Sequence, residues 1–131
     1  MKAIKLLGLI FIISILGGCE KDKQYVYSSN LIGEWAWVST CGGFSGLCTT
    51  PETTNLTAKL VYGADSMYYE YQNNSLISSY QFHLKSQISE GGDTLKFIQT
   101  ANGTQAYSIN DNALYISFVG ADFWSTYKRI K

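Results

Sequence analysis

Apolar and polar residues alternate along most of the chain after residue 33, with a period of two rather than the 3.6 of a helix. Such alternation turns one side of a segment toward a core and the other toward solvent, which is typical of antiparallel strands. Turn-forming pairs such as Asn73-Asn74 and Asn102-Gly103 separate the alternating segments. The pattern predicts eight strands, over residues 34–40, 56–62, 67–72, 76–87, 95–98, 105–109, 114–119 and 123–130.

Most segments between these strands are tight turns, apart from a loop with the cysteines and Pro51, and none has the period of a crossover helix. Consecutive strands are therefore expected to pair antiparallel. A sheet avoids exposed edges by closing on itself, and eight strands close into a small barrel. We expect an all-β fold, an eight-stranded antiparallel up-and-down β-barrel over residues 31–131, with a β-sandwich as the alternative. Ser78 interrupts the apolar face of the strand predicted at 76–87.

The N-terminal segment has a different pattern. Residues 6–16 are apolar except for Gly8 and Ser14, and they follow a basic start that contains Lys2 and Lys5. This run is too short to span a bilayer core, which requires about 20 apolar residues. A basic start, a short apolar run and small residues after it indicate a secretory signal peptide.

Leu16-Gly17-Gly18-Cys19 resembles the lipobox of bacterial lipoproteins. The resemblance implies removal of residues 1–18 and acylation of Cys19, which would anchor the protein to a membrane. Residues 19–30, which begin with alternating charges, would then be the lipidated cysteine and a solvated tether. The implied location is the cell envelope, at the outer membrane of a Gram-negative bacterium. An ordinary signal peptide followed by a chance cysteine is the alternative.

Charge and composition exclude some partners. The whole chain has formal net charge +0, and loss of Lys2 and Lys5 with the signal would leave 8 basic and 10 acidic residues. No basic stripe is present to meet the phosphates of a nucleic acid, so we expect no nucleic-acid partner.

Cysteine usage agrees with export. Without Cys19, the chain keeps Cys41 and Cys48, an even number that favours a disulfide in an oxidising compartment. A two-thiolate metal site is the alternative, but zinc requires four ligands and the only histidine, His83, is distant in sequence. We therefore predict a Cys41–Cys48 disulfide, with no metal and no cofactor.

Two motifs near the ends of the predicted barrel resemble lipocalins. Gly33-Glu34-Trp35 matches the Gly-x-Trp that opens the first lipocalin strand, and Arg129, the only arginine, ends the last strand as in that family. With the lipobox, the chain resembles the short lipocalin-like lipoproteins of Gram-negative bacteria. The resemblance implies that Arg129 lies over Trp35 and, with Gly33, plugs one end of the barrel. The chain leaves no room for the helix that lipocalins carry after the barrel, so the interior is either a ligand cavity or simply filled.

Aromatic residues provide the candidate ligand site. Trp37 follows Trp35 on one face of its strand, Tyr69 and Tyr71 share a face of another, and Tyr127 shares a face with Phe123 and Arg129. If those faces are interior, Trp37, Tyr69, Tyr71 and Tyr127 would line a lumen that suits an amphipathic ligand; the alternative is that they form the core.

No residues have the spacing of a catalytic site. No serine stands in a Gly-x-Ser-x-Gly elbow, no carboxylate pair is marked, and His83 reads as a surface or packing residue. We therefore expect no enzyme, but a lipid-anchored protein that binds a small apolar or amphipathic ligand. The alternative is a protein-binding module, an inhibitor or an accessory subunit of a surface complex. Asp65-Ser66-Met67 and Asp93-Thr94-Leu95 also resemble the O-glycosylation triplets of some Gram-negative envelope proteins.

Overall fold

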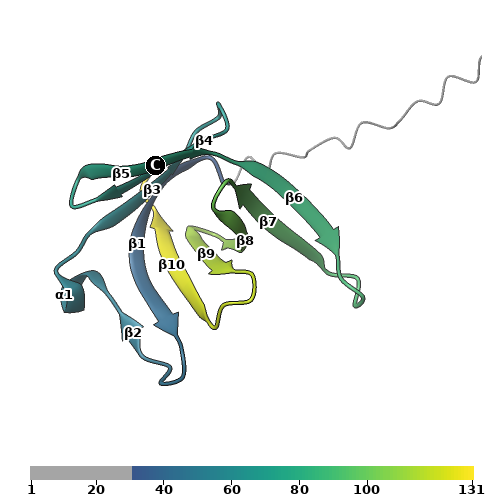
Figure 1. Ribbon diagram of the computed structural model, residues 1–131, viewed down its shortest axis with the longest axis horizontal. Coiled ribbons are helices and arrows are strands. Elements are labelled where there is room, and N and C mark those ends of the chain that lie inside the picture. Colours follow the sequence, from purple (N-terminus) through teal and green to yellow (C-terminus); the bar gives the residue numbers. More distant parts are fainter. Residues whose placement is uncertain (1–30) are drawn as a thin grey trace, which may run out of the picture.

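The computed structural model describes residues 31–131, so the expectations for the signal peptide, Cys19 and the tether lie outside the described residues. The described chain is all-β and forms one antiparallel sheet that curls strongly into an open half-barrel (Figure 1). Within residues 31–131, no helix is long and apolar enough to cross a membrane. The elements are β1 (Gly33–Gly42), β2 (Cys48–Thr49), α1 (Pro51–Thr54), β3 (Ala58–Tyr62), β4 (Met67–Gln72), β5 (Ser75–Gln81), β6 (His83–Ile88), β7 (Thr94–Thr100), β8 (Gly103–Asn110), β9 (Ala113–Phe118) and β10 (Phe123–Arg129).

The sheet is built from two meanders that meet at its centre. The hydrogen-bonded order is β5-β4-β3-β1-β10-β9-β8-β7-β6, with β2 paired to the end of β1. Strands β1 and β10 are therefore neighbours, although they lie at opposite ends of the described chain. The predicted antiparallel up-and-down order is confirmed. The alternative of a sandwich is wrong, because all strands belong to one sheet.

The strand predicted at 76–87 is two strands, β5 and β6, which meet at Phe82. β5 pairs with β4, whereas β6 pairs with β7, so the two halves have different partners. Phe82 is fully buried, and its N–H donates to the carbonyl of Ser66 at 2.9 Å. This anchor marks the point where the chain passes from one half of the sheet to the other. β5 and β6 are the two edge strands of the sheet. The half-barrel is therefore open between them, at the place where the sequence predicted one continuous strand.

The concave side of the sheet holds the core. Trp35 is at its centre with no exposed surface, and its indole N–H donates to the carbonyl of Leu31 at 2.9 Å. Burial of these apolar side chains is the main stabilising term, at about 25 cal/mol per Å² of apolar surface. The buried residues are Leu31, Trp35, Leu60, Tyr62, Phe82, Leu84, Ile98, Tyr107, Leu114 and Ile116.

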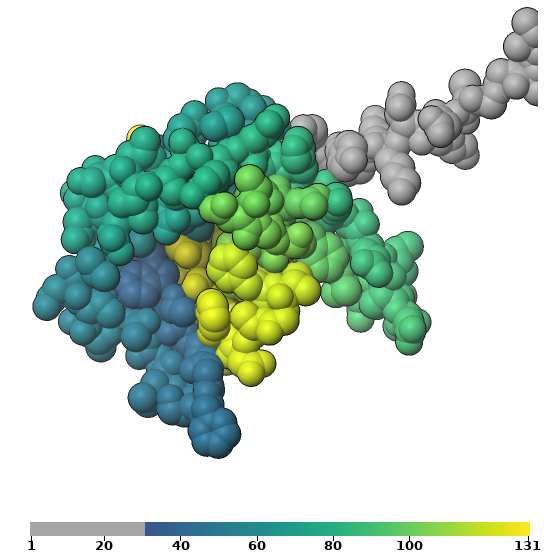
Figure 2. Space-filling view, in the orientation of Figure 1, coloured from purple at the N-terminus to yellow at the C-terminus, as the bar shows by residue number. Residues whose placement is uncertain are grey.

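A disulfide joins Cys41 and Cys48, as predicted, and closes the loop between β1 and β2. This loop projects from the body of the domain (blue, lower part of Figure 2). A one-turn helix, α1, follows it and was not predicted from the sequence. Its start is fixed locally: the hydroxyl of Thr50 accepts from the N–H of Thr53, and the hydroxyl of Thr53 accepts from the N–H of Thr50. Pro51 occupies the first turn, where a missing N–H costs nothing.

Candidate ligand-binding site

Arg129 lies over Trp35 at one end of the sheet. The guanidinium carbon is 4.0 Å from the ring centroid of Trp35, and one guanidinium nitrogen donates to the carbonyl of Ile32 at 3.0 Å. The stacking predicted from the sequence is therefore present in the structure. Gly33 lies beside this pair with φ +141°, and a Cβ there would collide with the carbonyl of Lys131 and approach Arg129. The end of the sheet where β1 begins is thus packed around the guanidinium.

Tyr69 and Tyr71 lie on the opposite face of β4 from the core. They alternate with Tyr68 and Glu70, which belong to the concave side. The ring of Tyr71 lies below the ammonium of Lys59, 4.9 Å from the ring centroid, and Lys59 also pairs with Glu34 at 3.1 Å. The expectation that Tyr69 and Tyr71 line an interior is therefore wrong.

Trp37 and Tyr127 are cross-strand partners in the β1–β10 register. Tyr127 packs against the buried cluster, and the indole N–H of Trp37 donates to the hydroxyl of Thr40 at 3.0 Å. That hydroxyl is 2.7 Å from the hydroxyl of Ser125. Burial raises the pKa of Tyr127 to about 12, so its hydroxyl keeps its proton at neutral pH. These two aromatic residues lie on the concave side as expected, and their part in binding stays a prediction.

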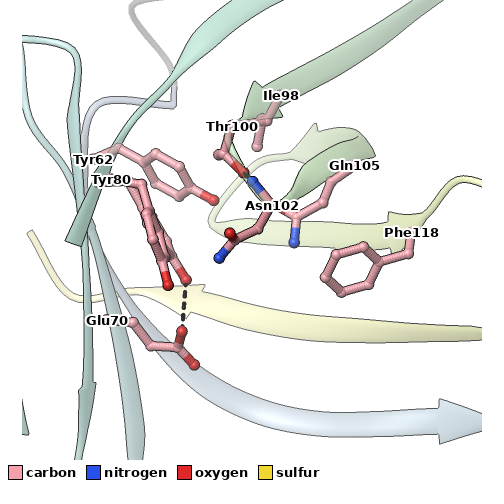
Figure 3. Close-up of a pocket in the computed structure, with 9 residues that line it drawn as sticks. Tyr62, Glu70, Tyr80, Ile98, Thr100, Asn102, Gln105 and Phe118 are labelled. Carbon is pink, nitrogen blue, oxygen red and sulfur yellow. Dashed lines mark hydrogen bonds between the residues drawn. The ribbon is translucent and has the colours of Figure 1, made fainter. Parts of the chain in front are cut away.

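A pocket lies on the concave side, between β3–β5 on one hand and β7–β9 on the other (Figure 3). Its volume is about 100 Å³, well below the several hundred Å³ typical of sites for drug-sized ligands. It is lined by Tyr62, Tyr68, Glu70, Tyr80, Ile98, Thr100, Asn102, Gln105 and Phe118. The two sides of the pocket come from the two meanders, so the pocket depends on how the sheet curls.

The small pocket adjoins a wider hollow, because Tyr80 and Thr100 line both. The hollow has a volume of about 430 Å³ and is also lined by Gln81, His83 and Gln99. It lies where β5 and β7 face each other without pairing. The hollow therefore borders the pocket at the open side of the half-barrel.

Glu70 is the charged residue of the pocket. Its carboxylate oxygen Oε2 accepts from the hydroxyl of Tyr68 at 3.1 Å and from that of Ser78 at 3.0 Å. Both hydrogen bonds go to the same oxygen, and the ion pairs within residues 31–131 belong to Glu34 rather than Glu70. The rings of Tyr68 and Tyr80 stack beside it, with centroids 6.3 Å apart. The pocket thus combines one carboxylate with several aromatic rings.

Tyr62 places an unsatisfied hydroxyl at this pocket. Its side chain is 1% exposed, and the hydroxyl has no hydrogen-bond partner within the described chain. Figure 3 shows the hydroxyl directed toward the side chains of Asn102 and Gln105. Burial, followed by the charges of Tyr127 and Glu70, raises the pKa of Tyr62 well above its ordinary value. A buried polar atom without a partner is costly, and such atoms often mark a site completed by water or a ligand.

Reasoning from sequence missed most of the pocket. Tyr62, Glu70, Asn102 and Gln105 were not proposed as binding residues. One signal was available, since Ser78 interrupts an apolar face and its hydroxyl proves to bind Glu70. His83, expected to be a surface or packing residue, is exposed. Within residues 31–131, no three His, Cys, Asp or Glu side chains lie close enough together to hold a metal ion.

Comparison with known proteins gives no relative for this chain. No family model, curated protein or solved structure matches it. The fold and the geometry of the pocket are therefore the basis for any statement about function.

Proposed function

We propose that the protein is a lipid-anchored envelope protein of a Gram-negative bacterium that binds a small amphipathic ligand on the concave side of a lipocalin-like half-barrel. Residues 1–18 are its signal peptide, Cys19 is its lipidated residue, and residues 19–30 tether the domain. The single arginine stacked on the tryptophan of the Gly-x-Trp motif supports the lipocalin likeness. The protein has no catalytic role in this proposal.

The observation that carries ligand binding is the buried hydroxyl of Tyr62 at the pocket. Leaving such a group unpaired costs about 1–3 kcal/mol, and a ligand atom that pairs with it recovers part of this cost. Aromatic rings on several sides give the same site an apolar contact surface. Polar and apolar contacts in one small pocket are what an amphipathic ligand requires.

Titration of the full-length protein with three five-carbon compounds, pentanol, pentanoate and pentylammonium, tests ligand binding. We expect saturable NMR shift changes for residues 98–105 and for Tyr62 and Tyr80 with at least one compound. Tyr62→Phe should weaken that binding, whereas Tyr69→Phe, which changes the same group on the other face of the sheet, should not. Absence of saturable shifts with all three compounds would refute the proposal.

A second candidate function, a protein-binding module, is favoured by the end of the domain near the disulfide. The N–H of Gly43 donates to the carbonyl of Asp122 at 2.9 Å, which holds the Cys41–Cys48 loop against the β9–β10 turn. Large apolar side chains are exposed at this end, and these are Phe44, Leu47, Val119, Phe123 and Trp124. Exposed apolar residues that gather in one place often mark a protein interface.

In-cell photo-crosslinking distinguishes this second function. A photoreactive residue at position 44 should give one defined adduct, and the same residue at Tyr115, which is exposed on β9, should not give it. Equal labelling at both positions would indicate collisions without a specific partner.

A further inference from the structure

We infer that the pocket between the two meanders is specific for a small organic cation with N–H donors, a protonated primary amine, whose charged group is held by Glu70. This inference rests on the proposed ligand binding and adds the chemical class of the group that enters the pocket.

The first argument is the sign of the charge. Arg129 is stacked on Trp35 and bonded to the carbonyl of Ile32, so its position is explained by the packing at that end. Among the pocket residues, Glu70 alone carries a formal charge at neutral pH. A carboxylate accepts hydrogen bonds and cannot donate them, and it attracts a cation more strongly in a partly enclosed site than in water.

The second argument is the vacant acceptor capacity. Tyr68 and Ser78 both donate to Oε2 of Glu70, and Oε1 receives no hydrogen bond from the described residues. An ammonium has three donors and needs several acceptors around it. Oε1 of Glu70 is one such acceptor, and the hydroxyl oxygens of Tyr68 and Tyr80 beside it can supply others. The hydroxyl of Tyr62 and the amides of Asn102 and Gln105 lie on the other side of the pocket, where they can contact the rest of the ligand.

The third argument is the aromatic wall. Tyr62, Tyr68, Tyr80 and Phe118 line the pocket together with the carboxylate. The ring centroids of Tyr62 and Tyr68 are 5.2 Å apart at an interplanar angle of 42°, so the two rings form a corner rather than a flat stack. Cations are attracted to ring faces, and rings that surround a carboxylate favour an organic cation over a hydrated metal ion.

The size of the pocket limits what enters it. About 100 Å³ holds an amino group with a few carbon atoms, and the adjoining hollow leaves space for whatever the amine is attached to. The ligand class is therefore an amine whose charged end is inserted between the meanders.

The test compares head groups in the full-length protein. The dissociation constants of pentylammonium, pentanol and pentanoate are measured by calorimetry, with NMR shifts of residues 98–105 as the reporter of location. We expect pentylammonium to bind at least about tenfold more tightly than pentanol, and pentanoate to bind most weakly, because hydrogen bonds to a charged group are the stronger class.

Two variants locate the effect. Glu70→Gln should abolish the preference for pentylammonium while leaving pentanol binding within about twofold. Glu34→Gln removes the same charge from the outer face, where Glu34 pairs with Lys59, and should keep the preference. Unfolding curves of both variants verify that the fold is retained.

The outcomes separate this inference from the proposed function. If pentanol binds as tightly as pentylammonium in the wild type, the cation inference is wrong and ligand binding stands. If Glu34→Gln lowers pentylammonium binding as much as Glu70→Gln does, the preference reflects overall charge and the site assignment is wrong. If none of the three compounds binds, both the inference and the proposed function fail.

Discussion

Trp35 and Arg129 face each other directly in the β1–β10 register, and the guanidinium carbon of Arg129 lies 4.0 Å from the indole centroid. The residues are far apart in the sequence, yet their contact lies where the two halves of the sheet join. The same guanidinium donates to the carbonyl of Ile32, so one side chain links the last strand to the residues just before β1. This makes the pair a stability determinant that can be tested directly.

Arg129→Lys should lower the free energy of unfolding by about 1–3 kcal/mol, because an ammonium loses both the planar stacking and the forked donors. Denaturant unfolding of wild type and variant measures the loss. Lys128→Arg, at the neighbouring exposed position, is the control and should change stability by less than about 0.5 kcal/mol. Equal stability of Arg129→Lys and the wild type would show that the stacking contributes nothing.

Gly33→Ala should be destabilising for two separate reasons. Its φ of +141° is strained for any residue with a Cβ, and the added methyl would collide with the carbonyl of Lys131. Gly120→Ala is the matched control. Gly120 also has a positive φ, at +84°, but an added Cβ there would have no neighbouring atom within 4 Å. The difference in unfolding free energy between the two variants isolates the steric effect, and Gly33→Ala should be the less stable of the two.

Removing the disulfide should cost about 2–3 kcal/mol on the chain-entropy model, because the closed loop is short. Mass measurement without reduction should show Cys41 and Cys48 joined in the native wild-type protein. Unfolding of the Cys41→Ser, Cys48→Ser double variant then measures the stability change. Two free thiols in the native protein would contradict the structure.

Tyr62 should make stability depend on alkaline pH. Its folded pKa is raised by burial, so the protonated hydroxyl is favoured in the folded state, and the stabilisation is complete below the unfolded pKa of about 10. The free energy of unfolding should fall as the pH rises above about 10. In that range the tyrosine hydroxyl loses its proton in the unfolded state but keeps it in the folded state. Tyr68 and Tyr127 act in the same direction.

Tyr62→Phe should reduce this alkaline loss and leave stability at pH 7 unchanged or slightly higher, since the hydroxyl has no partner within the described chain. Denaturant unfolding at pH 7 and at about pH 10.5 measures both effects. Tyr115→Phe, which changes an exposed ring, is the control. A marked loss of stability in Tyr62→Phe at pH 7 would show that the hydroxyl is well hydrogen-bonded.

Under the proposed function, Cys19→Ala should prevent acylation and leave the unprocessed precursor, because the resemblance of residues 16–19 to a lipobox implies cleavage just before this cysteine. Mass spectrometry of envelope protein and metabolic labelling with a fatty acid measure the modification. Cys48→Ala, which removes a cysteine far from the signal, should still be labelled. Wild-type protein recovered without lipid would contradict the prediction.

Strand positions were largely predictable, but the face of β4 was not. Met67, Tyr69 and Tyr71 alternate with Tyr68, Glu70 and Gln72, and the first set is the more apolar, which favoured the wrong face. The face is decided by the register across the β3–β4 turn, where Tyr62 lies opposite Tyr68. Because Tyr62 belongs to the core, Tyr68 and Glu70 follow it to the concave side. Register depends on turn geometry, which periodicity does not report.

The break at Phe82 was hidden for a related reason. Tyr80, Phe82 and Leu84 continue the same apolar alternation through β5 and into β6, so nothing in the pattern marks an end. What changes at Phe82 is the pairing partner, from β4 to β7, and pairing is a tertiary property. The pocket was missed with it, because its two sides belong to the two meanders that this change of partner separates.

The central position of β1 and β10 has a consequence for the order of events during synthesis. The ribosome makes β1 first among the described strands, but its central partner emerges only after every other strand has been made. Until then each meander can form its hairpins alone, while the contact between Trp35 and Arg129 and the joined core must wait. Contacts between residues so far apart in the sequence form slowly, because closing a long loop costs conformational entropy. The growing chain should therefore stay incompletely folded, and accessible to chaperones, until β10 has been made.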